Sequence, residues 1–76
     1  MPQIELSVWT ITDHPADFPT MFVARHHIVG PVGERTTDEI ILSPSLEGLR
    51  YLLELRGLTN AGRRPEDHPV IVESWI

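Results

Sequence analysis

The fold is decided by residues 43–58, which read SPSLEGLRYLLELRGL. Helical spacing places four leucines on one face, and this stripe predicts an amphipathic helix: Leu46, Leu49, Leu52 and Leu53. We expect Ser43 to cap its start, with Pro44 in the first helical position, where a missing N–H costs nothing. Gly57 is expected to end the helix in a left-handed conformation, after which Leu58 folds back onto Leu53.

Three other segments have the composition of strands, which favour β-branched and aromatic residues. Ile4–Thr12 and Met21–Val29 alternate in polarity as half-buried strands do, and Val70–Ile76 predicts the last strand. Glu39–Leu42 predicts at most a short additional strand. The order β-β-(β)-α-β therefore predicts a single α+β domain over residues 1–76. In it, one amphipathic helix covers one face of a small, mostly antiparallel sheet of three to four strands.

The inward face of each strand is assigned from its side chains. Arg25 does not readily enter a core, so the face that carries Phe22 is placed inward in the second strand. The faces that carry Leu6 in the first strand and Val72 in the last strand are placed against the helix. The predicted core then consists of Ile4, Leu6, Val8, Phe22, Ala24, Ile28, Leu46, Leu49, Leu52, Leu53, Val70 and Val72.

Composition restricts the classes of function. The chain has 11 acidic and 6 basic residues, for a formal net charge of −5, which disfavours binding to nucleic acid. It has no cysteine, which excludes disulfides and thiolate metal ligands and fits a cytoplasmic protein. No apolar segment approaches the ~18 residues that cross a membrane, and the first residues lack the pattern of a secretory signal. We therefore expect a cytoplasmic protein that binds neither nucleic acid nor membranes.

The sheet face opposite the helix is the first candidate functional surface. One helix covers one face of a small sheet, so the assignment above leaves two tryptophans on the other face. Tryptophan on a partly polar face is typical of an interface hot spot. We therefore predict self-association as a homodimer, or binding of a protein partner, through Trp9, Ile11, Arg25, Ile71, Glu73 and Trp75. The alternative is that these side chains form cross-strand pairs over the sheet without a partner.

A repeated Asp-His-Pro triplet, at residues 13–15 and 67–69, is the second candidate. Imidazoles and carboxylates with neighbouring arginines can bind a small ligand or a divalent metal, or act as general acid and base. The residues concerned are Asp13, His14, Arg63, Arg64, Asp67 and His68. A real strand at Glu39–Leu42 is expected to place the two triplets at opposite ends of the sheet. Turn formation alone also explains both triplets, so no metal, cofactor or catalytic residue is assigned.

Adjacent His26 and His27 point to opposite faces of their strand and cannot bind one metal together. The sequence as a whole favours a binding or structural module over an enzyme.

Four segments follow one another along the chain: DHPADFP at 13–19, MFVAR at 21–25, SLEGLR at 45–50 and PEDHPVIVESWI at 65–76. Their order resembles that of a group of short uncharacterised bacterial proteins, over nearly the full chain. The resemblance implies a bacterial origin and brings no site residue with it.

Overall fold

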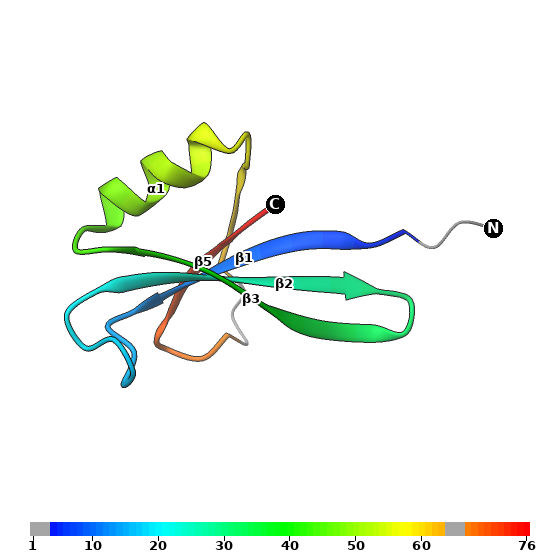
Figure 1. Cartoon of the computed structure of the whole chain (residues 1–76), viewed down its shortest axis with the longest axis horizontal. Helices are drawn as coiled ribbons and strands as arrows, with labels where there is room; N and C mark the ends of the chain where they lie inside the picture. Colours follow the sequence, from blue (N-terminus) through cyan, green and yellow to red (C-terminus); the bar gives the residue numbers. More distant parts are fainter. Residues whose placement is uncertain (1–3, 64–66) are drawn as a thin grey trace.

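The computed structural model describes residues 4–63 and 67–76. The elements in these residues are β1 (Leu6–Asp13), β2 (Phe22–Gly30), β3 (Gly33–Ser43), α1 (Leu46–Leu55), β4 (Asn60–Gly62) and β5 (Ile71–Trp75). The strands form one antiparallel sheet in the order β3-β2-β1-β5-β4, and α1 lies on one side of it (Figure 1). The predicted α+β class is confirmed, but the described residues form five strands, not three to four. None of their helices is long and apolar enough to cross a membrane.

Two strands account for the difference. β3 has 11 residues, where the sequence predicted a short piece at Glu39–Leu42, and it pairs with β2 through a turn between Gly30 and Gly33. Its first half is polar because β3 lies at the edge of the sheet, where side chains meet water. β4 has three exposed residues and pairs with β5 at the opposite edge.

The helix begins at a different cap from the predicted one. Ser45 is the N-cap, and its Oγ accepts a hydrogen bond from the Gly48 backbone N–H at 3.0 Å. Ser43 ends β3, and its Oγ accepts the Ser45 backbone N–H at 3.3 Å. A Cβ on residue 48 would lie 2.8 Å from the Ser43 Oγ and 2.9 Å from the Ser45 Oγ. Gly48 therefore leaves room for both serine hydroxyls at the start of α1.

The predicted end of the helix is confirmed. Gly57 has a φ of 79°, and its N–H donates to the Glu54 carbonyl at 2.9 Å. The Leu58 N–H donates to the Leu53 carbonyl at 3.2 Å, which completes a Schellman motif. The Leu58 side chain then packs against the buried core beside α1.

The helix covers the face of the sheet that carries the tryptophans. The core is a cluster of buried side chains from both layers: Trp9, Ile11, Ala24, Leu49, Leu53 and Trp75. The register between β1 and β2 explains this arrangement, since Trp9 lies opposite His26 and Ile11 lies opposite Ala24. Residues that face each other in neighbouring strands share one side of the sheet. Once Ala24 is inward, Trp9 and Ile11 are inward as well.

The predicted inward face of β1 is therefore wrong. For the last strand the prediction is wrong for Val70 and for Trp75, but it holds for Val72, which packs against the core where the register between β5 and β1 shifts. Among the predicted core residues, four are exposed: Ile4, Leu6, Leu52 and Val70. Val8 is buried, but it lies on the side of the sheet opposite Trp9, and Ile28 is half-buried. The prediction is confirmed for Ala24, Leu49 and Leu53, which are fully buried, and for Phe22, Leu46 and Val72, which pack against them.

Candidate functional site

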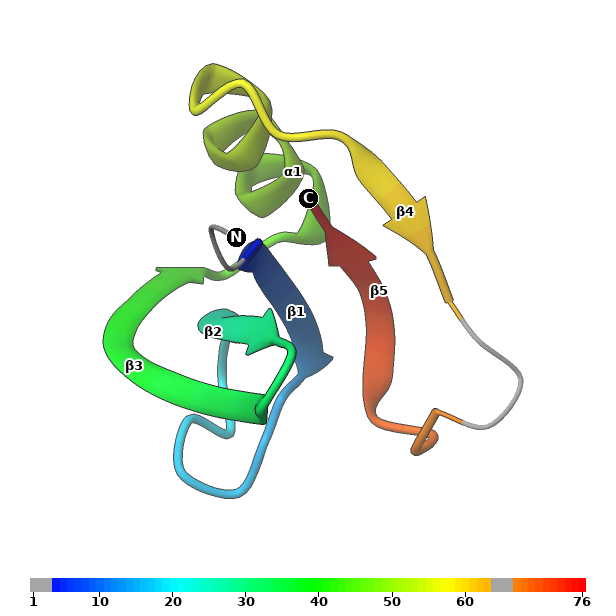
Figure 2. The same ribbon diagram turned by 90° about the vertical axis from the view of Figure 1, so that its right-hand side faces the viewer.

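The sheet face turned away from α1 contains a hollow of about 630 Å³. Figure 2 shows the sheet curving from β3, past β1, to β5 and β4, and this curvature gives the open face its concave shape. We call this hollow the trough. Its apolar lining residues are Leu6, Val8, Val29, Ala61, Ile71 and Ile76.

Strand alternation produces the apolar lining. In β1, Leu6, Val8 and Thr10 point away from the helix, since Trp9 and Ile11 point toward it. Leu6 lies opposite Val29 in β2, so the two side chains share the open face. Leu6, Val29 and Ile76 keep 48%, 37% and 45% of their surface exposed. An apolar strip therefore faces water along the trough.

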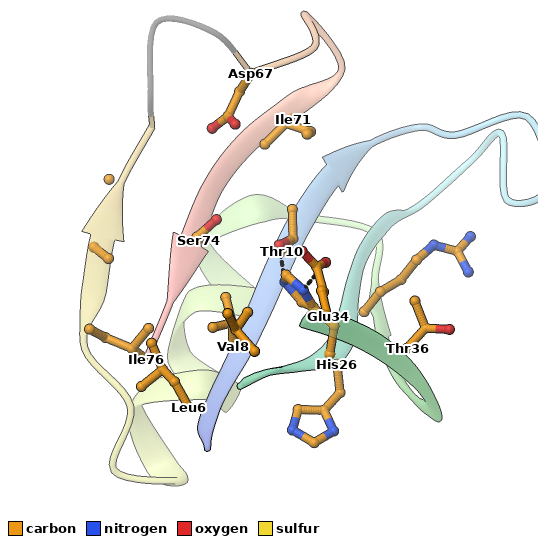
Figure 3. Close-up of a pocket in the computed structure, with 15 residues that line it drawn as sticks. Leu6, Val8, Thr10, His26, Glu34, Thr36, Asp67, Ile71, Ser74 and Ile76 are labelled. Carbon is orange, nitrogen blue, oxygen red and sulfur yellow. Dashed lines mark hydrogen bonds and ion pairs between the residues drawn. The ribbon is translucent and has the colours of Figure 1, made fainter. Parts of the chain in front are cut away.

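A chain of polar side chains crosses three strands in the trough. Thr10 of β1 lies 2.8 Å from His27 of β2, between Oγ1 and Nε2. The other ring nitrogen of His27, Nδ1, lies 2.5 Å from Oε1 of Glu34 in β3. Figure 3 shows Thr10 and Glu34 close to each other, with the apolar side chain of Val8 nearby. The His27 side chain is 17% exposed, whereas Glu34, at 56%, lies at the rim.

The hydrogen-bonding roles in this chain follow from the carboxylate. A carboxylate can only accept a hydrogen bond, so His27 Nδ1 is the donor in the bond to Glu34. In a neutral imidazole the second nitrogen, Nε2, is then an acceptor. In that neutral form the Thr10 hydroxyl donates to Nε2. Glu34 orients the ring, and the ring orients the hydroxyl of Thr10.

His26 belongs to a different set of contacts. Its ring lies 4.8 Å from that of Trp9, centroid to centroid, and it bonds to Ser7 through Nε2 at 2.5 Å and to Thr37 through Nδ1 at 2.9 Å. Figure 3 shows His26 directed away from Thr10 and Glu34. The two adjacent histidines thus serve opposite sides of the sheet.

The predicted interface residues are divided between the two faces. Trp9 and Trp75 are each 3% exposed and Ile11 is 0% exposed, so the expectation that these side chains lie on the uncovered face is wrong. Glu73 is also buried. Arg25 and Ile71 do line the trough. An additional contact holds the Arg25 side chain, which pairs with Asp17 and lies over the ring of Phe18.

Glu73 forms an ion pair beneath the helix. Arg50 of α1 donates to it twice, from Nε at 3.0 Å and from Nη2 at 2.6 Å. Trp75 Nε1 donates to the same carboxylate at 2.7 Å. The hydrogen bonds from Arg50 lower the pKa of the Glu73 carboxyl, against the opposing effect of burial. Glu73 therefore fastens the helix to β5.

The two Asp-His-Pro triplets lie at the same end of the sheet, although β3 is a real strand. The expectation of opposite ends is wrong because β4 adds one more reversal of the chain before β5. β1 and β5 are antiparallel, and the Asp13 N–H donates to the Val70 carbonyl at 2.9 Å.

The side chains of the triplets are engaged locally. His14 bonds to the carboxylate of Asp13, and His68 accepts a hydrogen bond from the backbone N–H two residues later. Arg63 donates to two backbone carbonyl oxygens, each at 3.0 Å, and so ties its own loop to β5. Arg64 lies outside the described residues. Within residues 4–63 and 67–76, no group of three or more histidine or acidic side chains could hold a metal ion.

Sequence reasoning missed the central polar residues of the trough, Thr10 and Glu34. The available signal was the turn between Gly30 and Gly33, which sets the register that brings Glu34 within reach of His27. Comparisons with protein-family models, curated proteins and solved structures find no match. The resemblance to a group of short bacterial proteins therefore stays a prediction, and the case for function rests on the geometry of the trough.

Proposed function

We propose that this protein is a small binding module whose trough holds an apolar molecule of small-ligand size. The observation that carries this proposal is a concave lining in which apolar side chains lie beside the Thr10–His27–Glu34 chain. Further polar side chains complete the lining, among them Arg25, Thr36, Asp67 and Ser74. Small-molecule sites have this character, with volumes of roughly 300–1,000 Å³, and the trough has about 630 Å³.

The exposed apolar side chains supply the driving force for binding. Leu6, Val29 and Ile76 are each 37–48% exposed, and a ligand that covers them removes this surface from water. Such burial stabilises a complex by about 25 cal/mol per Å². The polar chain then fixes the orientation of the ligand, since an unmatched polar group in an apolar site lowers affinity.

Self-association across the same face is the second candidate function. It is favoured by the same exposed apolar strip, because a chain of 76 residues buries a small core and gains from covering such a face. The occupant would then be a second copy of this chain, paired through Leu6, Val29 and Ile76. Trp9 and Trp75 have no part in this dimer.

Two measurements test these candidates. Light scattering after gel filtration gives the mass in solution, to be compared with 8.6 kDa for one chain. Titration with 4-propylphenol, followed by ¹H–¹⁵N NMR, shows which amides respond to a small apolar molecule. The matched variants are Val29→Asn in the trough and Leu55→Asn on the helix, where Leu55 is 65% exposed.

A monomer whose trough amides shift saturably, with weaker binding in Val29→Asn alone, supports the ligand site. A dimer that Val29→Asn dissociates and Leu55→Asn does not supports self-association instead. Shifts scattered over the surface of a monomer, or equal effects of the two variants, would remove both candidates.

A further inference from the structure

The trough presents an oxygen whose hydrogen is already committed. The Thr10 hydroxyl has one hydrogen and two acceptor positions. When the His27 ring is neutral, that hydrogen points to Nε2, 2.8 Å away, because Nδ1 of the same ring donates to Glu34. Thr10 lines the trough, so what its hydroxyl offers to an occupant is an acceptor.

This arrangement discriminates between ligands of equal size by the hydrogen-bonding group that they carry. A bound molecule with an O–H or N–H group can donate to the Thr10 oxygen. An ether or ketone oxygen placed there would meet a second acceptor and lose the hydrogen bond that water gave it. The selection depends on three residues from three strands. Glu34 orients the imidazole of His27, and the imidazole orients the hydroxyl of Thr10.

We propose that the trough selects apolar molecules that carry a hydrogen-bond donor, such as a phenol or an alcohol, and that Thr10 Oγ1 is their acceptor. This inference rests on the proposed ligand site and adds the class of ligand to it. Val8 and Ile71, which line the trough with Thr10, contact the apolar body of the ligand. The donor group then lies against Thr10.

The test compares 4-propylphenol with 4-propylanisole, its methyl ether, at pH 8, where histidine side chains are ordinarily neutral. Both probes have the same apolar body, and only the phenol donates. We expect the phenol to bind roughly three- to tenfold tighter, which is the effect of one neutral hydrogen bond. The ether is the more apolar probe, so hydrophobicity alone predicts the opposite order.

Three variants locate the cause of the preference. Thr10→Val keeps the β-branched shape and removes the acceptor, so the preference for the phenol should disappear. Thr36→Val removes another hydroxyl of the trough lining and should leave the preference unchanged. In Glu34→Gln the amide can either accept from His27 Nδ1 or donate to it, so the ring is no longer held with its hydrogen on Nδ1 and the Thr10 hydrogen is no longer confined to Nε2. The preference for the phenol should then weaken.

The outcomes separate this inference from the proposed function. If neither probe shifts the trough amides, the ligand site itself is refuted. If both bind there with the ether equal or tighter in the unmodified protein, the ligand site stands and the role of Thr10 is refuted. Loss of the preference in Thr36→Val to the same extent as in Thr10→Val would also refute it.

Discussion

Replacing Arg50 with methionine should destabilise the protein strongly at neutral pH. Methionine keeps most of the length and apolar stem of Arg50 but removes both hydrogen bonds to Glu73. The Glu73 carboxylate, whose side chain is 6% exposed, would then remain buried with the Trp75 indole and the Asn60 side chain as hydrogen-bond partners but without a positive charge beside it. A buried charge without its partner is costly, so the loss should exceed that of a surface ion pair.

The magnitude follows from the exposure of the pair. Breaking a fully buried ion pair costs about 3–5 kcal/mol. The Arg50 side chain is 40% exposed, and water therefore screens part of the interaction. We expect a loss of about 2–3 kcal/mol in the free energy of unfolding at pH 7. For a domain of this size, that corresponds to a fall of roughly 10–20 °C in Tm.

The loss should also depend on pH. Arg50 lowers the pKa of Glu73 in the folded protein. Its contribution is therefore complete above the unfolded carboxyl pKa of about 4.3, and it disappears as the pH falls through the lower folded pKa. In Arg50→Met the buried carboxyl gains a proton more readily. The stability difference between the two proteins should thus narrow below about pH 4.

Urea denaturation at several pH values measures these differences. Fluorescence of the buried Trp9 and Trp75 reports unfolding, and far-UV circular dichroism provides a second signal because Trp75 contacts Glu73. Arg35→Met is the matched control, since Arg35 pairs with Glu5 at an exposed site and should cost less than about 1 kcal/mol.

Adding Glu73→Met to Arg50→Met should recover part of the loss, because the unpaired charge is then gone. A loss below about 1 kcal/mol at pH 7, or one that stays constant from pH 7 to pH 3, would refute the reasoning.

Three further substitutions and one control, Leu55→Ala, are measured by the same denaturation and test the packing and the caps of the helix. Leu53→Ala should lower the free energy of unfolding by about 2–5 kcal/mol because Leu53 is 0% exposed. Leu55→Ala, at a site that is 65% exposed, should lower it far less. Equal losses of stability in the two variants would contradict the observed helix face. Ser45→Ala should cost about 1 kcal/mol through loss of the bond to the Gly48 N–H, and no loss would mean that Ser45 is not the cap. Gly57→Ala should cost about 1–2 kcal/mol, since φ is 79°, and a gain in stability would contradict the left-handed cap.

The helix could be predicted from the sequence because its determinants are local. The leucine spacing and Gly57 act within a few residues of chain. Leu46, Leu49 and Leu53 face the core and Gly57 ends the helix as expected, whereas Leu52 is 38% exposed. The start was misplaced by two residues because Ser43 and Ser45 are both competent caps. Their roles are divided by the sheet, since Ser43 pairs with Phe22 at the end of β3 and leaves Ser45 to begin the helix.

The two edge strands could not be predicted from local pattern. β4, at Asn60–Gly62, has no apolar alternation, and its extended conformation comes from pairing with Trp75 and Ser74 of β5. The first half of β3 is polar because an edge strand in water needs no apolar face, so it too shows no apolar alternation. The trough was missed as a consequence, because the Thr10–His27–Glu34 chain depends on the register of three strands.

The reversal of faces in β1 has a physical cause that also bears on function. Leu6 and Val8 on one side compete with Trp9 and Ile11 on the other, so both faces of this strand are apolar and alternation alone cannot choose between them. The pairing with β2 determines which face of β1 the helix covers. Ala24 lies under the helix and Ile11 lies opposite Ala24, so Ile11 lies under the helix as well. On the side of β1 turned away from the helix, Val8 is 8% exposed, whereas Leu6 is 48% exposed. A strand that served only to hold a helix would need one apolar side, and the exposed Leu6 on the second side of β1 is therefore the strongest reason in the chain to expect an occupant in the trough.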